Sequence, residues 1–76
     1  MKIELTAKAI GEMVKKTRKR LEITQKDLAL SSGTGLRFII DLEAGKATCQ
    51  LGKAMTVVQT LGIIADFTLP PSFDGL

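Results

Sequence analysis

The amino-acid sequence predicts a mainly α fold of about four helices that ends in one C-terminal β-strand. Apolar residues recur at helical spacing along residues 6–62, and the glycines at positions 33, 45 and 62 mark helix ends. Residues 63–69 instead place apolar side chains at alternate positions, which is the pattern of a strand. Because 76 residues suffice for one domain only, we assign residues 1–76 to a single domain with a helical part (6–62), a strand (63–69) and a tail (70–76).

The first helix is expected to begin at Thr6 and to end near Arg20. Thr6 can act as the N-cap, because its hydroxyl can accept a hydrogen bond from a free backbone N–H group. The residues expected on its inner face are Ile10, Met13, Val14, Thr17 and Leu21. The helix ends in a basic stretch, and residues 1–20 carry a net charge of +5. Such a stretch attracts polyanions, although cations also suit a helix C-terminus for structural reasons alone.

Two short helices are expected next, over residues 24–32 and 35–44. Thr24 is the expected N-cap of the first, with Asp27 placed three residues later as a capping partner. Gly33 suits the left-handed backbone that ends a helix, and the second short helix begins almost at once. The residues expected to face the core are Leu28, Ala29, Ile39 and Leu42, with Phe38 at the edge.

A fourth helix is expected over residues 51–62, followed by the strand. Its expected inward positions are Leu51, Ala54, Met55, Val58 and Leu61. The strand places Ile63, Ala65, Phe67 and Leu69 on one face. Because an unpaired strand leaves backbone groups without partners, we expect these residues to form a homodimer contact with the same strand of a second subunit. Pairing with residues 2–5 of the same chain is the alternative.

The composition argues against several functional classes. The chain has no histidine and one cysteine, so histidine-based catalysis and thiolate or histidine metal sites are excluded. We therefore expect no catalytic residues, no metal and no cofactor. No signal-peptide pattern is present, and no apolar run reaches the roughly 18–20 residues of a membrane span, so we expect a cytoplasmic protein that does not enter a membrane.

Two short helices joined by a tight glycine turn form a helix-turn-helix unit, whose first helix crosses the DNA backbone and whose second lies in the major groove. Residues 21–46, LEITQKDLALSSGTGLRFIIDLEAGK, resemble the DNA-binding unit of the Xre/phage-repressor family, which has a lambda-repressor-like fold. The family pattern is matched at Thr24-Gln25, Leu28-Ala29, Gly33, Ile39 and Leu42-Glu43-Ala44-Gly45-Lys46. Over residues 4–69 the chain is most similar to HipB-type antitoxins, through the basic end of its first helix, the RFI and DLE steps, LGKAMTVVQTLGI and the terminal strand.

This resemblance implies a sequence-specific transcriptional repressor that binds a double-stranded DNA operator as a homodimer. It further implies an antitoxin that binds a HipA-like kinase toxin and represses its own operon. A stand-alone or phage-type Xre repressor without a toxin is the first alternative. The second is a protein-interaction module with little DNA affinity, which the apolar Leu36 and Ile40 on one helix face would favour.

The expected DNA contacts divide by role. Base contacts are predicted for Thr34, Gly35, Leu36, Arg37 and Asp41. Phosphate contacts are predicted for Thr24, Gln25, Lys46, Lys19 and Arg20. The guanidinium of Arg37 can donate to guanine O6 and N7 together, although a phosphate contact or a solvated side chain is the alternative.

Three further expectations concern neighbouring polar residues. Asp41 can accept from cytosine N4, or it stays solvated or pairs with Lys26. Gln25 can instead serve as a polar helix start without a phosphate contact. The resemblance also implies an ion pair between Arg18 and Glu43, joining the first and third helices.

Overall fold

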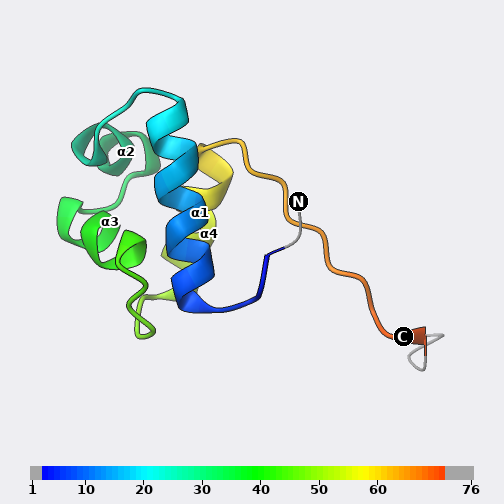
Figure 1. The fold of residues 1–76 in the computed structure, drawn as a ribbon. Coiled ribbons are helices and arrows are strands. Elements are labelled where there is room, and N and C mark those ends of the chain that lie inside the picture. Colours follow the sequence, from blue (N-terminus) through cyan, green and yellow to red (C-terminus); the bar gives the residue numbers. More distant parts are fainter. Residues whose placement is uncertain (1–2, 72–76) are drawn as a thin grey trace.

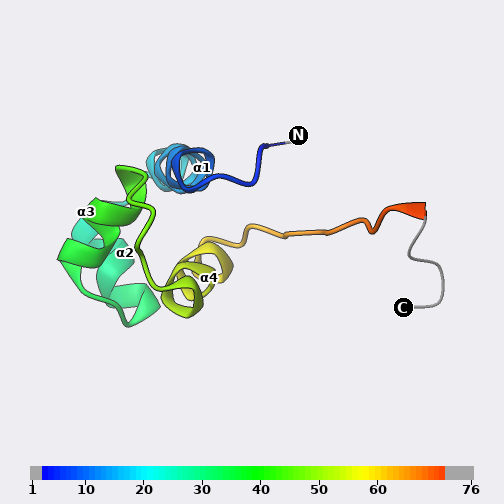
Figure 2. The ribbon, with the colours of Figure 1, turned by 90° about the horizontal axis from the view of Figure 1, so that it is seen from below.

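The computed structural model describes residues 3–71, which contain four α-helices. They are α1 (Ala7–Arg20), α2 (Gln25–Ser32), α3 (Leu36–Glu43) and α4 (Leu51–Thr60). In Figures 1 and 2, α2 and α3 lie together on one side of α1, and the C-terminal segment leaves on the opposite side. None of the helices described between residues 3 and 71 combines the length and apolarity needed to cross a lipid bilayer.

The starts of α1 and α2 are held by the predicted caps. The Thr6 hydroxyl accepts a hydrogen bond from the Ala9 backbone N–H at 3.1 Å. At α2, the Thr24 hydroxyl accepts from the Asp27 N–H at 3.0 Å, and the Asp27 carboxylate accepts from the Thr24 N–H at 3.1 Å. This reciprocal pair is a capping box, which satisfies two backbone donors that the helix leaves free.

The turn between α2 and α3 is built on Gly33, whose φ of 69° lies in the left-handed region. Its N–H and that of Thr34 donate to the carbonyls of Leu30 and Ala29, at 3.3 and 3.0 Å, and so close the end of α2. A side chain is strained at this φ, so glycine is the residue that suits the position. The chain then enters α3 after Gly35, as the sequence predicts.

The core lies where α1, α2, α3 and α4 meet. Its fully buried residues are Val14, Leu28, Ile39 and Val57, with Ala29, Leu42, Ala54 and Leu61 beside them. Of these, Val57 was not expected to face the core. The remaining seven are positions that helical spacing predicts.

Three expected core positions are wrong. Leu51 and Met55 are exposed, because α4 carries two overlapping apolar stripes and its inner one is formed by Ala54, Val57 and Leu61. Leu21 is also exposed. It lies beyond the last residue of α1, just before the left-handed Glu22 (φ 59°) redirects the chain. Helical spacing therefore no longer predicts which way the Leu21 side chain faces.

Residues 63–70 take no regular secondary structure, and no strand occurs among residues 3–71. Ile63, a predicted dimer residue, instead packs partly against the helical core, and its N–H donates to the Val58 carbonyl at 3.2 Å. Beyond it the segment runs away from the helices, in orange in Figures 1 and 2, and exposes Ile64, Phe67 and Leu69. The predicted strand is therefore absent from the single chain, and no ladder joins it to residues 3–5. The physical reason is that a strand needs a hydrogen-bonded neighbour, so pairing across a dimer stays a prediction. Residues 72–76 of the predicted tail, and residue 2 of the alternative pairing, lie outside the described residues.

Candidate nucleic-acid interface

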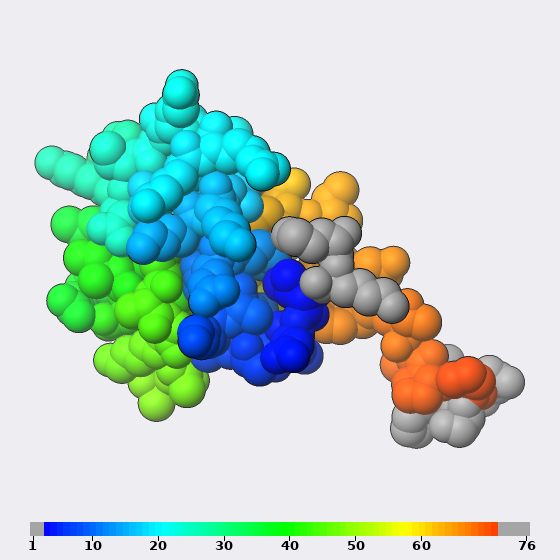
Figure 3. Space-filling view, viewed as in Figure 1, coloured from blue at the N-terminus to red at the C-terminus, as the bar shows by residue number. Residues whose placement is uncertain are grey.

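Helices α2 and α3 and the turn between them form one continuous surface, turned away from the C-terminal segment (Figure 3). Leu36 and Arg37 lie in the first turn of α3 and are exposed. Gly35 is exposed as well, with open space where a side chain would be. Three of the five predicted base-contact residues thus lie together at one accessible helix start.

The other two predicted base-contact residues are partly engaged within the protein. The hydroxyl of Thr34 lies 2.9 Å from that of Ser32, so it helps to close the end of α2. The carboxylate of Asp41 is only 19% exposed and pairs with Arg37 and Lys46, instead of with Lys26 or with solvent. The Arg37 side chain itself remains 78% exposed.

The Arg37–Asp41 contact has a defined geometry. Arg37 Nε and Nη2 both donate to Asp41 Oδ1, at 3.1 and 2.7 Å. Lys46 Nζ lies 3.6 Å from the other oxygen, Oδ2. The hydrogen bond from Arg37, helped by the charges of Arg37 and Lys46, holds the pKa of the Asp41 carboxyl below its usual value. The carboxylate is therefore charged at neutral pH, and two cations are gathered around it.

Ile40 and Leu36, the apolar pair on α3, differ in exposure. Ile40 is half-buried, whereas Leu36 is 44% exposed. The outer face of α3 thus offers one accessible apolar side chain beside Arg37, a position from which contact with a thymine methyl group is chemically reasonable.

A buried ion pair fixes α3 against α1. Arg18 Nε and Nη2 donate to the two carboxylate oxygens of Glu43, at 2.7 and 3.0 Å, and Arg18 Nη1 donates to the Ile23 carbonyl at 2.9 Å. The two side chains are 10% and 3% exposed. The hydrogen bond to Glu43 raises the pKa of Arg18 above its ordinary value. This is the pair that the family resemblance implies, and it fixes the position from which α3 presents its first turn.

Gln25 joins this pair, which sequence reasoning missed. Its Nε2 donates to Glu43 Oε1 at 3.2 Å, and its side chain is half-buried. An amide nitrogen carries two N–H donors, and this contact uses one of them. No local pattern could have shown this contact, because the partners are 18 positions apart in the sequence.

The remaining residues with predicted phosphate contacts precede α2 or follow α3 in the chain. Lys19 and Arg20 are exposed in the last turn of α1, and Lys46 is exposed just beyond the end of α3. The Thr24 hydroxyl serves as the cap of α2. Exposed cations thus lie before α2 and after α3 in the chain.

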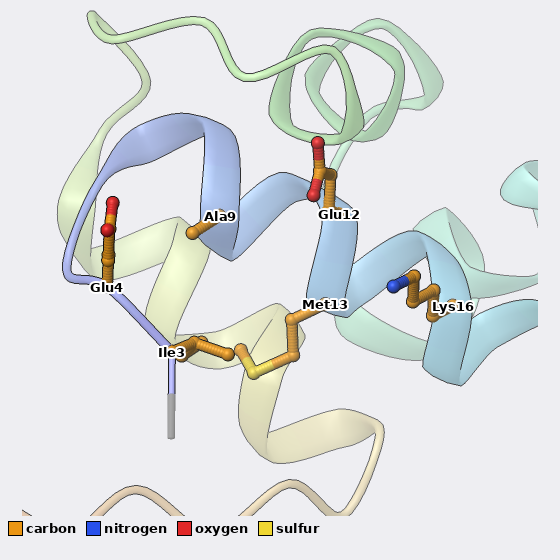
Figure 4. A pocket seen from close by; sticks show the side chains of 6 residues that line it. All are labelled: Ile3, Glu4, Ala9, Glu12, Met13 and Lys16. Atoms are coloured by element: carbon orange, nitrogen blue, oxygen red, sulfur yellow. The ribbon is translucent and has the colours of Figure 1, made fainter. Parts of the chain in front are cut away.

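A shallow hollow of about 190 Å³ lies elsewhere, between the N-terminal segment and α1. The side chains of Ile3 and Met13 point toward one another there, with Lys16 farther along α1 (Figure 4). No residue of α2 or α3 lines it, so it is separate from the candidate interface. Among residues 3–71, no group of three potential metal ligands is close enough to hold an ion.

The chain is similar to a known transcriptional regulator. No protein-family model matches the chain. An uncharacterized HTH-type transcriptional regulator of Sinorhizobium fredii is 51% identical to it over 61 residues, a stretch that covers 80% of each chain. The likeness therefore extends over most of both proteins and is not confined to a short motif.

Proposed function

The chain belongs to the HTH-type transcriptional regulators, and we propose that it is a sequence-specific DNA-binding repressor. The observation that carries this proposal is the exposed guanidinium of Arg37 in the first turn of α3. In a helix-turn-helix unit, the N-terminal residues of the second helix are those that reach base edges in the major groove. Arg37 has the donors for guanine, and the Arg18–Glu43 pair holds the helix that carries it.

The other residues of this surface would position the protein on the DNA duplex. Gln25 at the start of α2, Lys19 and Arg20 at the end of α1, and Lys46 after α3 would contact phosphates. Such contacts set the register of the protein on the duplex, while Arg37 and Leu36 would read bases. Thr34 and Gly35 would lie close to the base edges at the start of α3, and Thr24 would lie close to a phosphate at the start of α2.

A homodimer is part of this proposal. Two copies of α3 would enter successive major grooves, about 34–36 Å apart. Pairing of the two 63–69 segments across a twofold axis would hold the copies together and satisfy the backbone groups that the single chain leaves free. The exposed side chains of Phe67 and Leu69, which lie on the proposed contact face, support that assignment.

We further propose an antitoxin role, in which the repressor binds a HipA-like kinase toxin and regulates its own operon in the cytoplasm. This part rests on the resemblance over residues 4–69 to HipB-type antitoxins. A kinase-like reading frame beside the gene, and capture of its product by the native protein, would support it. A stand-alone or phage-type repressor would lack both.

The test of DNA binding uses the DNA upstream of the protein's own gene and a scrambled duplex of equal composition. We expect fluorescence anisotropy to show tighter binding to the natural duplex, with an affinity that falls as salt rises. Lys46→Ala should reduce the slope of log K against log salt by about one unit. Lys16→Ala is the matched control, because Lys16 lies at the separate hollow.

Two results would contradict the proposal. Equal affinity for both duplexes would remove sequence-specific repression. Undetectable binding to either duplex would instead favour the protein-interaction module, for which the exposed Leu36 is the supporting observation.

A further inference from the structure

Asp41 occupies a position that helix stability does not explain. It lies in the last turn of α3, where the negative end of the helix dipole disfavours an acidic residue. Its partner Arg37 precedes it by four positions, and this order of charges is less favourable than the reverse. A pair with an arginine this exposed contributes little to stability. Glu43, the other acid of that turn, has its own structural role with Arg18.

The contact leaves the reading edge of Arg37 free. A guanidinium has five N–H donors in one plane. Asp41 Oδ1 accepts hydrogen bonds from Nε and from one hydrogen of Nη2, along one edge of the planar guanidinium. The end of the fork, formed by Nη1 and the second hydrogen of Nη2, keeps two parallel N–H groups. These two donors can make a bidentate bond to guanine O6 and N7.

We propose that Asp41 is a specificity-determining positioning residue, which orients Arg37 for guanine and does not itself contact a base. This inference rests on the proposed DNA-binding function. An unrestrained arginine side chain must lose rotamer freedom on binding, and a side chain that is already held loses less. Asp41 lies one turn from Arg37 on the same helix, so the restraint moves with α3 as a unit.

Lys46 completes the arrangement. Its ammonium faces Asp41 Oδ2, so one carboxylate holds a base-reading cation on one oxygen and a phosphate-binding cation near the other. A carboxylate near DNA repels phosphates, and this repulsion opposes binding to every sequence alike. Asp41 should thus reduce affinity for random DNA while it raises the preference for guanine.

The experiment selects binding sites from a randomised duplex library, using the full chain and the variants Arg37→Ala, Asp41→Ala and Asp41→Asn. The position at which Arg37→Ala loses its guanine preference identifies the base that Arg37 reads. We expect Asp41→Ala to reduce guanine preference at that same position by roughly three- to tenfold, a part of what one bidentate contact supplies. Asp41→Asn should retain more of it, because the amide oxygen can still accept from Nε and Nη2.

A second readout separates positioning from a folding defect. Binding to a random duplex, followed by fluorescence anisotropy, should strengthen in both Asp41 variants because each removes a negative charge. A variant with a damaged fold would lose affinity for all DNA. The double variant Arg37→Ala/Asp41→Ala should select sites no less sharply than Arg37→Ala alone, since Asp41 acts through Arg37.

Several outcomes would overturn the inference. Loss of preference at a different base position in Asp41→Ala would show a direct contact, such as one with cytosine N4. An unchanged guanine preference in both Asp41 variants would show that Arg37 needs no positioning, while the proposed repressor function would stand. A wild-type protein that selects no sequence at all would remove the proposed function and this inference together.

Discussion

At the scale of single residues, Arg18 donates three side-chain hydrogen bonds. It bonds to both oxygens of Glu43 and to the Ile23 carbonyl, while Gln25 adds a further donor to Glu43. A buried ion pair is stable only when its members satisfy each other, because each has lost its hydration. This cluster therefore fixes the relative positions of the end of α1, the start of α2 and the end of α3.

Glu43→Ala should destabilise the protein by about 3 kcal/mol, because it leaves the Arg18 guanidinium buried without a counter-charge. Urea unfolding followed by circular dichroism measures this loss. A matched apolar pair, Arg18→Met with Glu43→Leu, should recover much of the stability. Strictly additive losses in the double-mutant cycle would show that the two residues do not interact.

The capping box of α2 predicts a dependence of stability on pH. Hydrogen bonds from the backbone and side chain of Thr24 hold the pKa of Asp27 below its usual value. Because the folded-state pKa is depressed, the stabilisation is complete above the unfolded-state pKa of about 3.9 and is lost as pH falls through the folded-state value. Asp27→Asn should thus lower the melting temperature at neutral pH, with a difference that shrinks in acid.

Thermal melts from neutral to strongly acid pH test this expectation. Asp66→Asn is the control, since Asp66 lies exposed in the extended C-terminal segment. A deficit of Asp27→Asn that stays constant down to the most acid pH would show that the charge of Asp27 does not stabilise the cap.

At the scale of the elements, α1 and α3 approach each other closely at Gly11. A Cβ atom at Gly11 would overlap the backbone carbonyl oxygen of Leu42 and lie 3.0 Å from that of Glu43. The missing side chain therefore lets the two helices approach near the ion pair. Glycine in a helix interior costs about 1 kcal/mol relative to alanine, so the close approach offsets a local penalty.

Gly11→Ala should destabilise the protein by about 1–3 kcal/mol, despite the better helix propensity of alanine, because rigid backbone would have to move. Gly52→Ala in α4 is the matched control, since a Cβ there would meet open space. That change should be neutral or stabilising, by up to about 1 kcal/mol. Chemical unfolding measures the free energy of unfolding of both variants. A Gly11→Ala variant that is more stable than the original protein would mean that α1 and α3 can separate at little cost.

At the scale of the whole molecule, the helical body is small and its C-terminal segment is apolar. Phe67 is 73% exposed in the single chain, and Leu69, on the same face of the proposed strand, is exposed as well. A chain of this size gains much from burying such surface against a second copy. Bivalent binding would also let two copies of α3 contact one operator.

Phe67→Asp, or truncation after Gly62, should shift the protein toward monomer, because either change removes the proposed contact between the two terminal segments. Analytical ultracentrifugation measures the shift, and circular dichroism should show largely retained helix. Operator affinity should fall steeply, since only one half-site would be held.

Thr68→Asp is the matched control, because position 68 lies on the opposite face of the proposed strand and should leave the dimer intact. A truncated chain that remains a dimer at micromolar concentration would rule out this segment as the main interface.

Much of this protein was determined by its sequence alone. The starts of α1 and α2 follow from Thr6 and Thr24, and the left-handed end of α2 follows from Gly33. These features depend on neighbours only a few positions away, so local chemistry decides them. The family pattern likewise indicated the Arg18–Glu43 pair and the accessible first turn of α3.

Only the tertiary structure decided the remaining features. Helical spacing allowed two apolar faces on α4, and packing against the other helices selected the one that contains Val57. Gln25 bonds to Glu43, 18 positions away, and Gly11 touches the carbonyl of Leu42. Asp41 had several available partners, and the path of the chain beyond α3 brought Lys46 to it. The Asp41–Lys46 contact joins positions five apart and depends on the path of the loop after α3. Each of the other outcomes depends on distances between segments far apart in the sequence, and such distances exist only once the helices have packed together.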